Sequence, residues 1–217
     1  MNDNTFDFNL FIKESKEVLL NPKTYFATLK TSGGMSEPLI KAVIYGALTG
    51  AISFLWSLLH IGVTSYGMFG GGAIGIMSFI WSVIGAIIGL FIGSVILLVI
   101  SSICKGNTDF EANMRVTATL MVMMPISALF SFAGYFNIYL GVIVSLAIGV
   151  YSLWLLYNAL IETLKANPET SKIVAYVLIA LLVVFTLAGI GVKKRADRFM
   201  DEFSNKDLNE LLKDTEE

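Results

Sequence analysis

Few side chains in this sequence could perform chemistry, and they do not form a recognisable set. His60 is the only histidine and Cys104 the only cysteine, so a metal site built from these residue types is not expected. Asp109 and Glu111 lie near basic residues in a short polar stretch and are expected to be solvated charges. His60 is expected to be hydrogen-bonded rather than a ligand. Acid–base and metal-assisted chemistry need a positioned base or ligand cluster. No catalytic residue, metal or cofactor is therefore expected.

Two long stretches without charged residues surround these few groups. Residues 42–104 contain no Asp, Glu, Lys or Arg over 63 positions, and residues 116–161 contain none over 46. A bilayer core of roughly 30 Å is crossed by about 20 apolar residues of helix. The whole chain is 55% hydrophobic and 15% charged, with a mean hydropathy of +0.73. The sequence therefore predicts an all-α, polytopic integral membrane protein.

A bundle of five transmembrane helices is expected from the alternation of apolar and polar segments. The spans are expected at residues 39–62, within 74–104, twice within 116–161, and at 173–192. Pro125 predicts a kink in the third span, and residues 134–137 predict the turn before the fourth. Two crossings within residues 73–103 are the alternative, but each would then measure only about 23 Å of helix, too short for the hydrocarbon core.

Polar segments flank the spans at both ends of the chain. We expect an amphipathic N-terminal helical segment at 1–38, a membrane domain at 39–192, and a charged C-terminal tail with a short helix at 193–217. Asn21 and Pro22 predict that the N-terminal helix stops and restarts, because Asn caps a helix and Pro fits its first turn. Lysines before the first span place the N-terminus inside. The basic residues at 193–198 would then lie outside, which leaves the side of the C-terminus open.

Small residues recur at four-residue intervals in three expected spans. They are Gly46, Gly50, Gly85, Gly89, Gly93, Gly141, Ser145 and Gly149. Small side chains at such spacing allow helix backbones to approach closely in lipid. We expect these positions to pack helices within the bundle or to form a homodimer, with Gly89 at a tight contact.

Two classes of function fit these features. A non-enzymatic scaffold or adaptor would bind lipids and other membrane proteins, for example the subunits of an ABC-type exporter. A permease or channel for a neutral or lipidic solute would instead need a polar cavity between the second and fourth spans. Its lining could come from Ser94, Ser101, Asn137, Ser145 and Asn158. No charged residue is expected inside the spans, which argues against a coupled transporter; nucleic acid is not an expected partner.

The order of several short motifs resembles the Yip1 domain family, in a short prokaryotic form. The stretches are NPKTYFATLK at 21–30, EPLIKAVIYGAL at 37–48 and KGNTDFEANMRVTATLMVMMP at 105–125. The family pattern would be filled by Asn21, Pro22, Pro38, Leu39, Gly106, Phe110 and Pro125. The resemblance implies five spans, an N-terminus facing the cytosol in a prokaryotic cytoplasmic membrane, and a non-enzymatic scaffold. Eukaryotic relatives act in vesicle traffic with prenylated Rab-type GTPases, an activity not expected of a prokaryotic chain.

Overall fold

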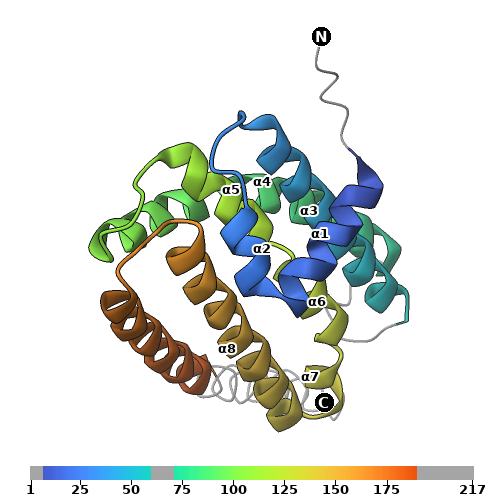
Figure 1. The fold of residues 1–217 in the computed structure, drawn as a ribbon. Coiled ribbons are helices and arrows are strands. Elements are labelled where there is room, and N and C mark those ends of the chain that lie inside the picture. The colour runs from blue at the N-terminus through green and yellow to red at the C-terminus, as the bar shows by residue number, and fades with distance from the viewer. Residues whose placement is uncertain (1–6, 60–70, 190–217) are drawn as a thin grey trace, which may run out of the picture.

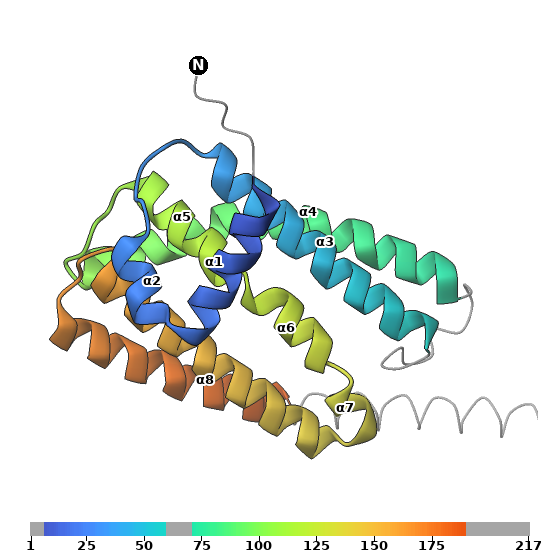
Figure 2. The ribbon, with the colours of Figure 1, turned by 45° about the vertical axis from the view of Figure 1, so that its right-hand side comes forward.

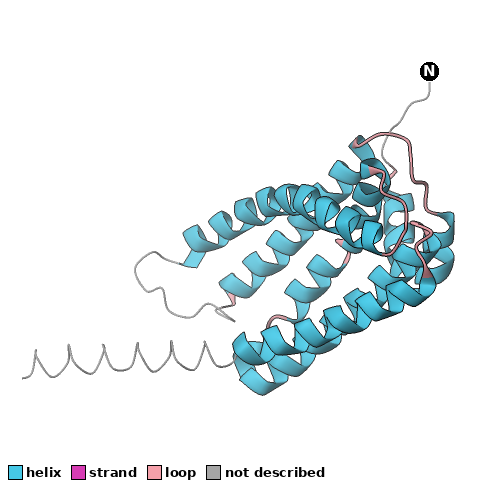
Figure 3. Cartoon of the chain, turned by 90° about the vertical axis from the view of Figure 1, so that its left-hand side faces the viewer, coloured by secondary structure: helices cyan, strands magenta, loops and turns pink. Residues whose placement is uncertain are grey.

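Every regular element in the described part of the chain is a helix (Figure 3). The computed structural model describes residues 7–59 and 71–189. The labelled helices are α1 (Phe8–Leu20), α2 (Pro22–Thr28), α3 (Ser36–Leu58), α4 (Gly71–Ile103), α5 (Phe110–Leu120), α6 (Met123–Phe130), α7 (Ala133–Phe136) and α8 (Ile138–Glu162). A further helix at Pro168–Gly189 is called the last span below.

Five segments of the described chain are long and apolar enough to cross a membrane. They are Ser36–Leu58, Ile76–Ile103, Phe110–Phe136, Ile138–Glu162 and Pro168–Gly189. The prediction of an all-α protein with five candidate spans is therefore confirmed. His60, the glycines within residues 60–70, and the charged tail at 193–217 lie outside the described residues.

The second span is one uninterrupted helix. α4 contains 33 residues, which at 1.5 Å per residue gives about 50 Å. This length exceeds the roughly 30 Å of a bilayer core, and tilting is one way in which long spans are accommodated. Residues 73–103 consequently do not fold into two crossings.

The third span is broken where the sequence places proline. α5 ends at Leu120 and α6 begins at Met123, two residues before Pro125. Proline has no N–H, and its ring collides with the carbonyl four residues earlier, which belongs to Met121. The expected turn at 134–137 is wrong in detail, because α7 continues to Phe136 and the chain turns at Asn137. The Asn137 side chain then caps α8 by accepting hydrogen bonds from Tyr139 N and Leu140 N.

The two ends of the bundle differ in what covers them. α1, α2 and the loops at 29–35, 104–109 and 163–167 gather at one end, which we call the docked end (Figure 2). The other end carries α7 and the start of α8, and we call it the open end. Figure 2 shows α6 lying between the α3–α4 pair and α8. Phe26 of α2 is fully buried against the bundle, so the N-terminal segment packs onto protein at the docked end (Figure 1).

Two loops at the docked end bind each other reciprocally. Asn107 N donates to Leu164 O at 2.7 Å, and Asn167 N donates to Cys104 O at 2.8 Å. Lys105 and Lys165 occupy the equivalent place in each loop, and both have a positive φ. The side chain of each Asn accepts a hydrogen bond from the backbone N–H two residues later. These bonds join the helix pair α4–α5 to the pair formed by α8 and the last span.

Candidate functional site

A buried lysine lies at the start of the first span. Lys41 occupies the second turn of α3 and is only 5% exposed. Its Nζ lies 2.8 Å from Glu14 Oε2 and 2.8 Å from Glu37 Oε1. Glu14 belongs to α1, whereas Glu37 lies one turn before Lys41 in α3. The lysine therefore binds the N-terminal segment to the membrane domain.

A buried arginine continues this cluster on the third span. Arg115 of α5 is also 5% exposed. Its Nη1 donates to Glu37 Oε2 at 2.8 Å, and its Nε donates to Glu111 Oε1 at 3.2 Å. Its Nη2 donates to Gly34 O at 2.9 Å, while Gly34 N donates to Glu111 Oε1 at 2.7 Å. Glu14, Glu37, Lys41, Glu111 and Arg115 form what we call the ion cluster.

Each cation of the ion cluster has more than one carboxylate partner. A buried charge is strongly destabilising unless it is paired and hydrogen-bonded, and both Lys41 and Arg115 meet two carboxylates. The cluster has three carboxylates and two cations, so its formal net charge is −1. Tyr25 of α2 interacts electrostatically with it. Burial raises the pKa of Tyr25 to about 12, although the positive charge of Lys41 acts in the opposite direction.

Glycine is required where the loop before α3 meets Arg115. Gly33 has a φ of +135° and Gly34 a φ of +92°, a region that side chains with a Cβ rarely adopt. A Cβ at Gly33 would also lie 2.9 Å from Arg115 Nη2. The two glycines therefore allow the loop to wrap around the guanidinium group.

A groove of about 450 Å³ opens beside the ion cluster. We call it the N-terminal groove, and its walls come from α1, α2 and α3. Its lining includes Leu10, Glu17, Tyr25, Leu29, Lys30 and Ile40, together with parts of the ion cluster. The groove thus combines apolar side chains with charges of both signs. Such a surface suits a polypeptide segment better than a single small anion or cation.

The sequence reading missed this cluster. The expectations that Glu111 is a solvated loop charge and that no charge lies inside a span are both wrong. The candidate spans begin earlier than expected, at Ser36 and Phe110, and so include Glu37, Glu111 and Arg115. Lys41 already lay inside the expected first span at 39–62. Asp109 caps α5 by accepting from Ala112 N at 2.9 Å. The Glu-x-x-x-Lys and Glu-x-x-x-Arg spacings at 37–41 and 111–115 were the available signal, because residues four apart meet on a helix.

Only some of the predicted glycines pack helices within the chain. A Cβ at Gly46 would meet Ala86 Cβ at 2.7 Å, and one at Gly50 would meet Phe79 at 2.9 Å, so both lie against α4. A Cβ at Gly93 would meet Thr117 of α5 at 2.9 Å. At Gly85 and Gly89 a Cβ would meet nothing within 4 Å.

The expected tight contact at Gly85 and Gly89 within the bundle is therefore wrong. The buried face of α4 instead carries Ala86, Leu90, Ser94, Leu97 and Ser101. Ala86 and Leu90 each follow one of these glycines, and one residue corresponds to about 100° of rotation on a helix. The two glycines are exposed and face away from the other helices in the described part of the chain. A homodimer through this face stays a prediction.

The polar residues proposed for a central cavity do not line one together. Ser101 Oγ donates to Asn107 O, Asn158 Nδ2 to Trp154 O, and Ser94 Oγ to Leu90 O. Asn137 caps α8, whereas Ser145 lines a cavity that lies between the third, fourth and last spans. The predicted cavity between the second and fourth spans with these five residues is therefore wrong.

The remaining residues of the family motif lie at the docked end. Pro22 begins α2, as predicted, but the Asn21 side chain makes no cap hydrogen bond. Pro38 and Leu39 lie in the first turn of α3, which begins at Ser36 rather than at the expected residue 39, and Phe110 begins α5. A Cβ at Gly106 would meet Ser101 Oγ at 2.6 Å, so glycine allows the close loop pairing there. Cys104 is fully buried beside it.

Comparison with known proteins bears on the identity of the chain. A family model for the Yip1 domain matches residues 16–190, from the middle of α1 to the end of the last span. No curated protein and no solved structure gives a significant match. The matched region includes the C-terminal part of α1, all of α2, every residue of the ion cluster except Glu14, and all five candidate spans. The chain is therefore an integral membrane protein of the Yip1 domain family, whose members are non-enzymatic membrane trafficking and binding proteins.

Proposed function

We propose that the protein is a membrane adaptor whose N-terminal groove holds a segment of another membrane protein. The occupant would be an amphipathic polypeptide segment carrying both apolar and charged side chains. An accessory role in a larger assembly, such as an ABC-type exporter, belongs to this proposal, and so does a homodimer. Catalysis is not part of it.

The observation that carries the proposal is the attachment of α1 to the spans beside an open groove. Glu14 and Lys41 join α1 to α3 through a buried ion pair, and Ser15 Oγ and Tyr45 Oη share a second bond of 2.7 Å. A rigidly held surface loses little conformational freedom on binding, which favours affinity. Leu10 of α1 nevertheless remains 51% exposed at the groove.

Two leucine-sized residues of α1 provide a matched test. Leu10 lines the groove and Ile12 does not, yet each is 51% exposed. They lie about 200° apart around the helix. The full-length tagged protein, purified from native membranes in mild detergent, should retain a stoichiometric partner. Leu10→Glu should lower recovery of that partner at least fivefold, whereas Ile12→Glu should leave it within twofold of the unmodified protein.

Two results would contradict the adaptor proposal. One is recovery of the protein alone in several mild detergents. The other is an equal loss of partner in both variants, which would indicate that α1 acts only through membrane association or stability. Gel filtration of each variant would first establish that it remains folded.

Orientation in the membrane is a separate part of the proposal. We propose that the N-terminus and the docked end face the cytosol of a prokaryotic cell, because lysines precede the first span. Single cysteines at Asn4, Thr108 and Thr215 in a Cys104→Ser background can be treated with an impermeant thiol reagent on intact cells. Only the Thr215 cysteine should react. Reaction at Thr108 with protection at Thr215 would reverse the proposed orientation.

A further inference from the structure

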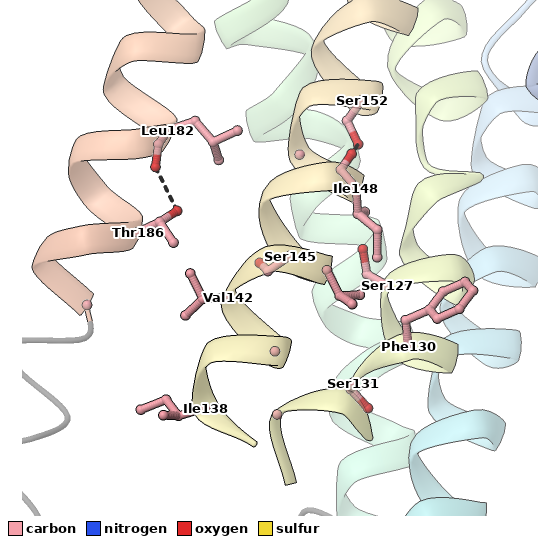
Figure 4. A pocket seen from close by; sticks show the side chains of 15 residues that line it. Ser127, Phe130, Ser131, Ile138, Val142, Ser145, Ile148, Ser152, Leu182 and Thr186 are labelled. Carbon is pink, nitrogen blue, oxygen red and sulfur yellow. Dashed lines mark hydrogen bonds between the residues drawn. The ribbon is translucent and has the colours of Figure 1, made fainter. Parts of the chain in front are cut away.

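A cavity of about 550 Å³ lies within the membrane-spanning region, near the open end. Its walls come from α6, α7, α8 and the last span (Figure 4). A volume of this size is in the range of small-molecule sites. The residues of the described chain that line it include no charged side chain.

Close contacts at two glycines of α8 bound the cavity. A Cβ at Gly141 would lie 2.5 Å from Gly134 Cα, so the turn between α7 and α8 is tightly closed. A Cβ at Gly149 would lie 2.7 Å from Leu182, so the last span touches α8 there. Ser145 lies midway between these glycines on the same face of α8. Gly141 and Gly149 thus lie in close contact with neighbouring segments, whereas Ser145 between them borders the cavity.

The hydroxyl groups of the cavity fall into two classes. Ser131, Ser152 and Thr186 donate to carbonyls of the preceding turn, at Ala128, Ile148 and Leu182. Ser127 and Ser145 also line the cavity, but neither forms a hydrogen bond within the described part of the chain. Water is scarce in the hydrocarbon region, so a hydroxyl there without a partner is destabilising.

The depth of Ser145 in the bilayer favours a lipid ester group as the hydrogen-bond acceptor for its hydroxyl. At 1.5 Å per residue, the 25 residues of α8 span about 37 Å. In a core of roughly 30 Å, Ser145 would lie about 7 Å below the hydrocarbon boundary if α8 stands upright and is centred in the core. Lipid ester groups lie close to this boundary. A charged headgroup finds no counter-charge in the lining, whereas an acyl chain fits its apolar part.

We propose that this cavity binds one acyl chain of a membrane phospholipid, with the ester carbonyl accepting a hydrogen bond from Ser145 or Ser127. The headgroup remains outside the cavity, at the membrane surface of the open end. The bound lipid fills the space between α8 and the last span. This site is independent of the N-terminal groove, which lies at the other end of the bundle.

The proposal is tested with the full-length protein in vesicles of phosphatidylethanolamine and phosphatidylglycerol in a 3:1 ratio. A few per cent of a phosphatidylcholine with a diazirine on one acyl chain serves as the probe, and crosslinked peptides are identified by mass spectrometry. Crosslinks to residues 127–152 and 182–189 should survive dilution with excess unlabelled lipid at least fivefold better than crosslinks to the lipid-facing side of α4. The latter report lipids that exchange freely around the protein.

Two variants on α8 separate the cavity from the general lipid surface. Ser145→Leu fills the cavity and should lower the retained crosslinks at least fivefold. Ala147→Leu adds the same side chain at an exposed position two residues away and should change them less than twofold. Unchanged retention in Ser145→Leu, or equal losses in both variants, would overturn the proposal.

The role of the hydroxyls is tested without changing the volume of the cavity. The double variant Ser127→Ala, Ser145→Ala keeps the space but removes both donors. The unmodified protein should retain an ester-linked probe about threefold better than the ether-linked analogue, which lacks the carbonyl. The double variant should lose this preference. Equal retention of both probes by the unmodified protein would contradict the hydrogen bond from serine.

Discussion

The docked end and the open end of the bundle are held together by different forces. At the docked end, α1 and α2 are joined to the spans by the ion cluster, by Thr163 Oγ1 donating to Phe26 O, and by Tyr151 Oη donating to Leu19 O. At the open end, no ion pair is present in the described part of the chain, and a cavity lies between α6, α7, α8 and the last span. Polar interactions therefore fix the shape of the docked end, whereas the proposed lipid would complete the open end.

This contrast has a consequence for motion. Regions with few buried contacts open locally at low free energy, whereas densely bonded regions open only with global unfolding. We therefore expect substitutions at the docked end to lower the global stability. Substitutions at the open end should act locally, on the helices around the cavity.

The largest effect is expected from Arg115→Met. This change leaves Glu111 without its cation, leaves Glu37 paired with Lys41 alone, and removes the donor to Gly34 O. Breaking a buried ion pair from one side destabilises a protein by about 3–5 kcal/mol. The free energy of unfolding, measured by titration of denaturing detergent into mixed micelles, should fall by that amount.

The matched control uses an ion pair at the surface of the same end. Lys13 and Glu17 lie 4.0 Å apart in α1, and the Lys13 side chain is 72% exposed. Exposed pairs contribute less than about 1 kcal/mol, so Lys13→Met should be nearly neutral. Similar losses in both variants would mean that the docked end does not depend on burial of the ion cluster.

The next largest effect concerns two glycines in neighbouring spans. Gly46→Leu places a side chain against Ala86 Cβ and the Ser82 carbonyl oxygen of α4, and overpacking of this kind destabilises by about 1–3 kcal/mol. Gly89→Leu enters open space and should change the free energy of unfolding little. The same detergent titration measures both. A large loss of folding or of self-association in Gly89→Leu alone would instead indicate that this face binds a second copy.

The contrast between these glycines marks the limit of what the sequence predicts. Runs without charge are long enough to define five spans, because the hydrocarbon thickness sets the required length. The four-residue spacing does not reveal which face of α4 meets α3, because that depends on where the helices cross. Gly89 therefore faces outward although it belongs to the same series as Gly93.

The ion cluster could not be predicted from the sequence for a related reason. Lys41 and Arg115 lie at the edges of charge-free stretches, where a sequence reading assigns charges to solvent. Their burial depends on α1 and the 29–35 loop folding over the docked end, and that is a tertiary contact. Pro125, by contrast, acts within its own helix, so the break in the third span could be located to within a few residues.

A smaller effect is expected from Thr163→Val at the docked end. Thr163 is 6% exposed, and its hydroxyl donates to Phe26 O at 2.7 Å. Valine has nearly the same shape but leaves this carbonyl without its donor, which destabilises by about 1–2 kcal/mol. Thermal unfolding of the detergent-solubilised protein should shift downward. Thr170→Val is the control, because Thr170 is half-buried in the last span and its hydroxyl makes only a long hydrogen bond of 3.4 Å to Asn167 Oδ1; it should shift the thermal unfolding less than Thr163→Val.

The smallest global effect is expected from Trp56→Phe, near the open end. The Trp56 Nε1 donates to Ala128 O at 2.9 Å, joining α3 to α6, and its ring packs against Phe132 with centroids 5.5 Å apart. Phenylalanine keeps most of the ring contact and loses the hydrogen bond, and side-chain hydrogen bonds in membrane proteins contribute about 0.6 kcal/mol on average. If the open end fluctuates independently, hydrogen exchange should accelerate at the amides of α6 and α7 while those of α2 and α5 remain unchanged. If hydrogen exchange accelerates at α2 and α5 by the same factor, the two ends unfold together. The docked end and the open end would then differ in composition but not in local stability.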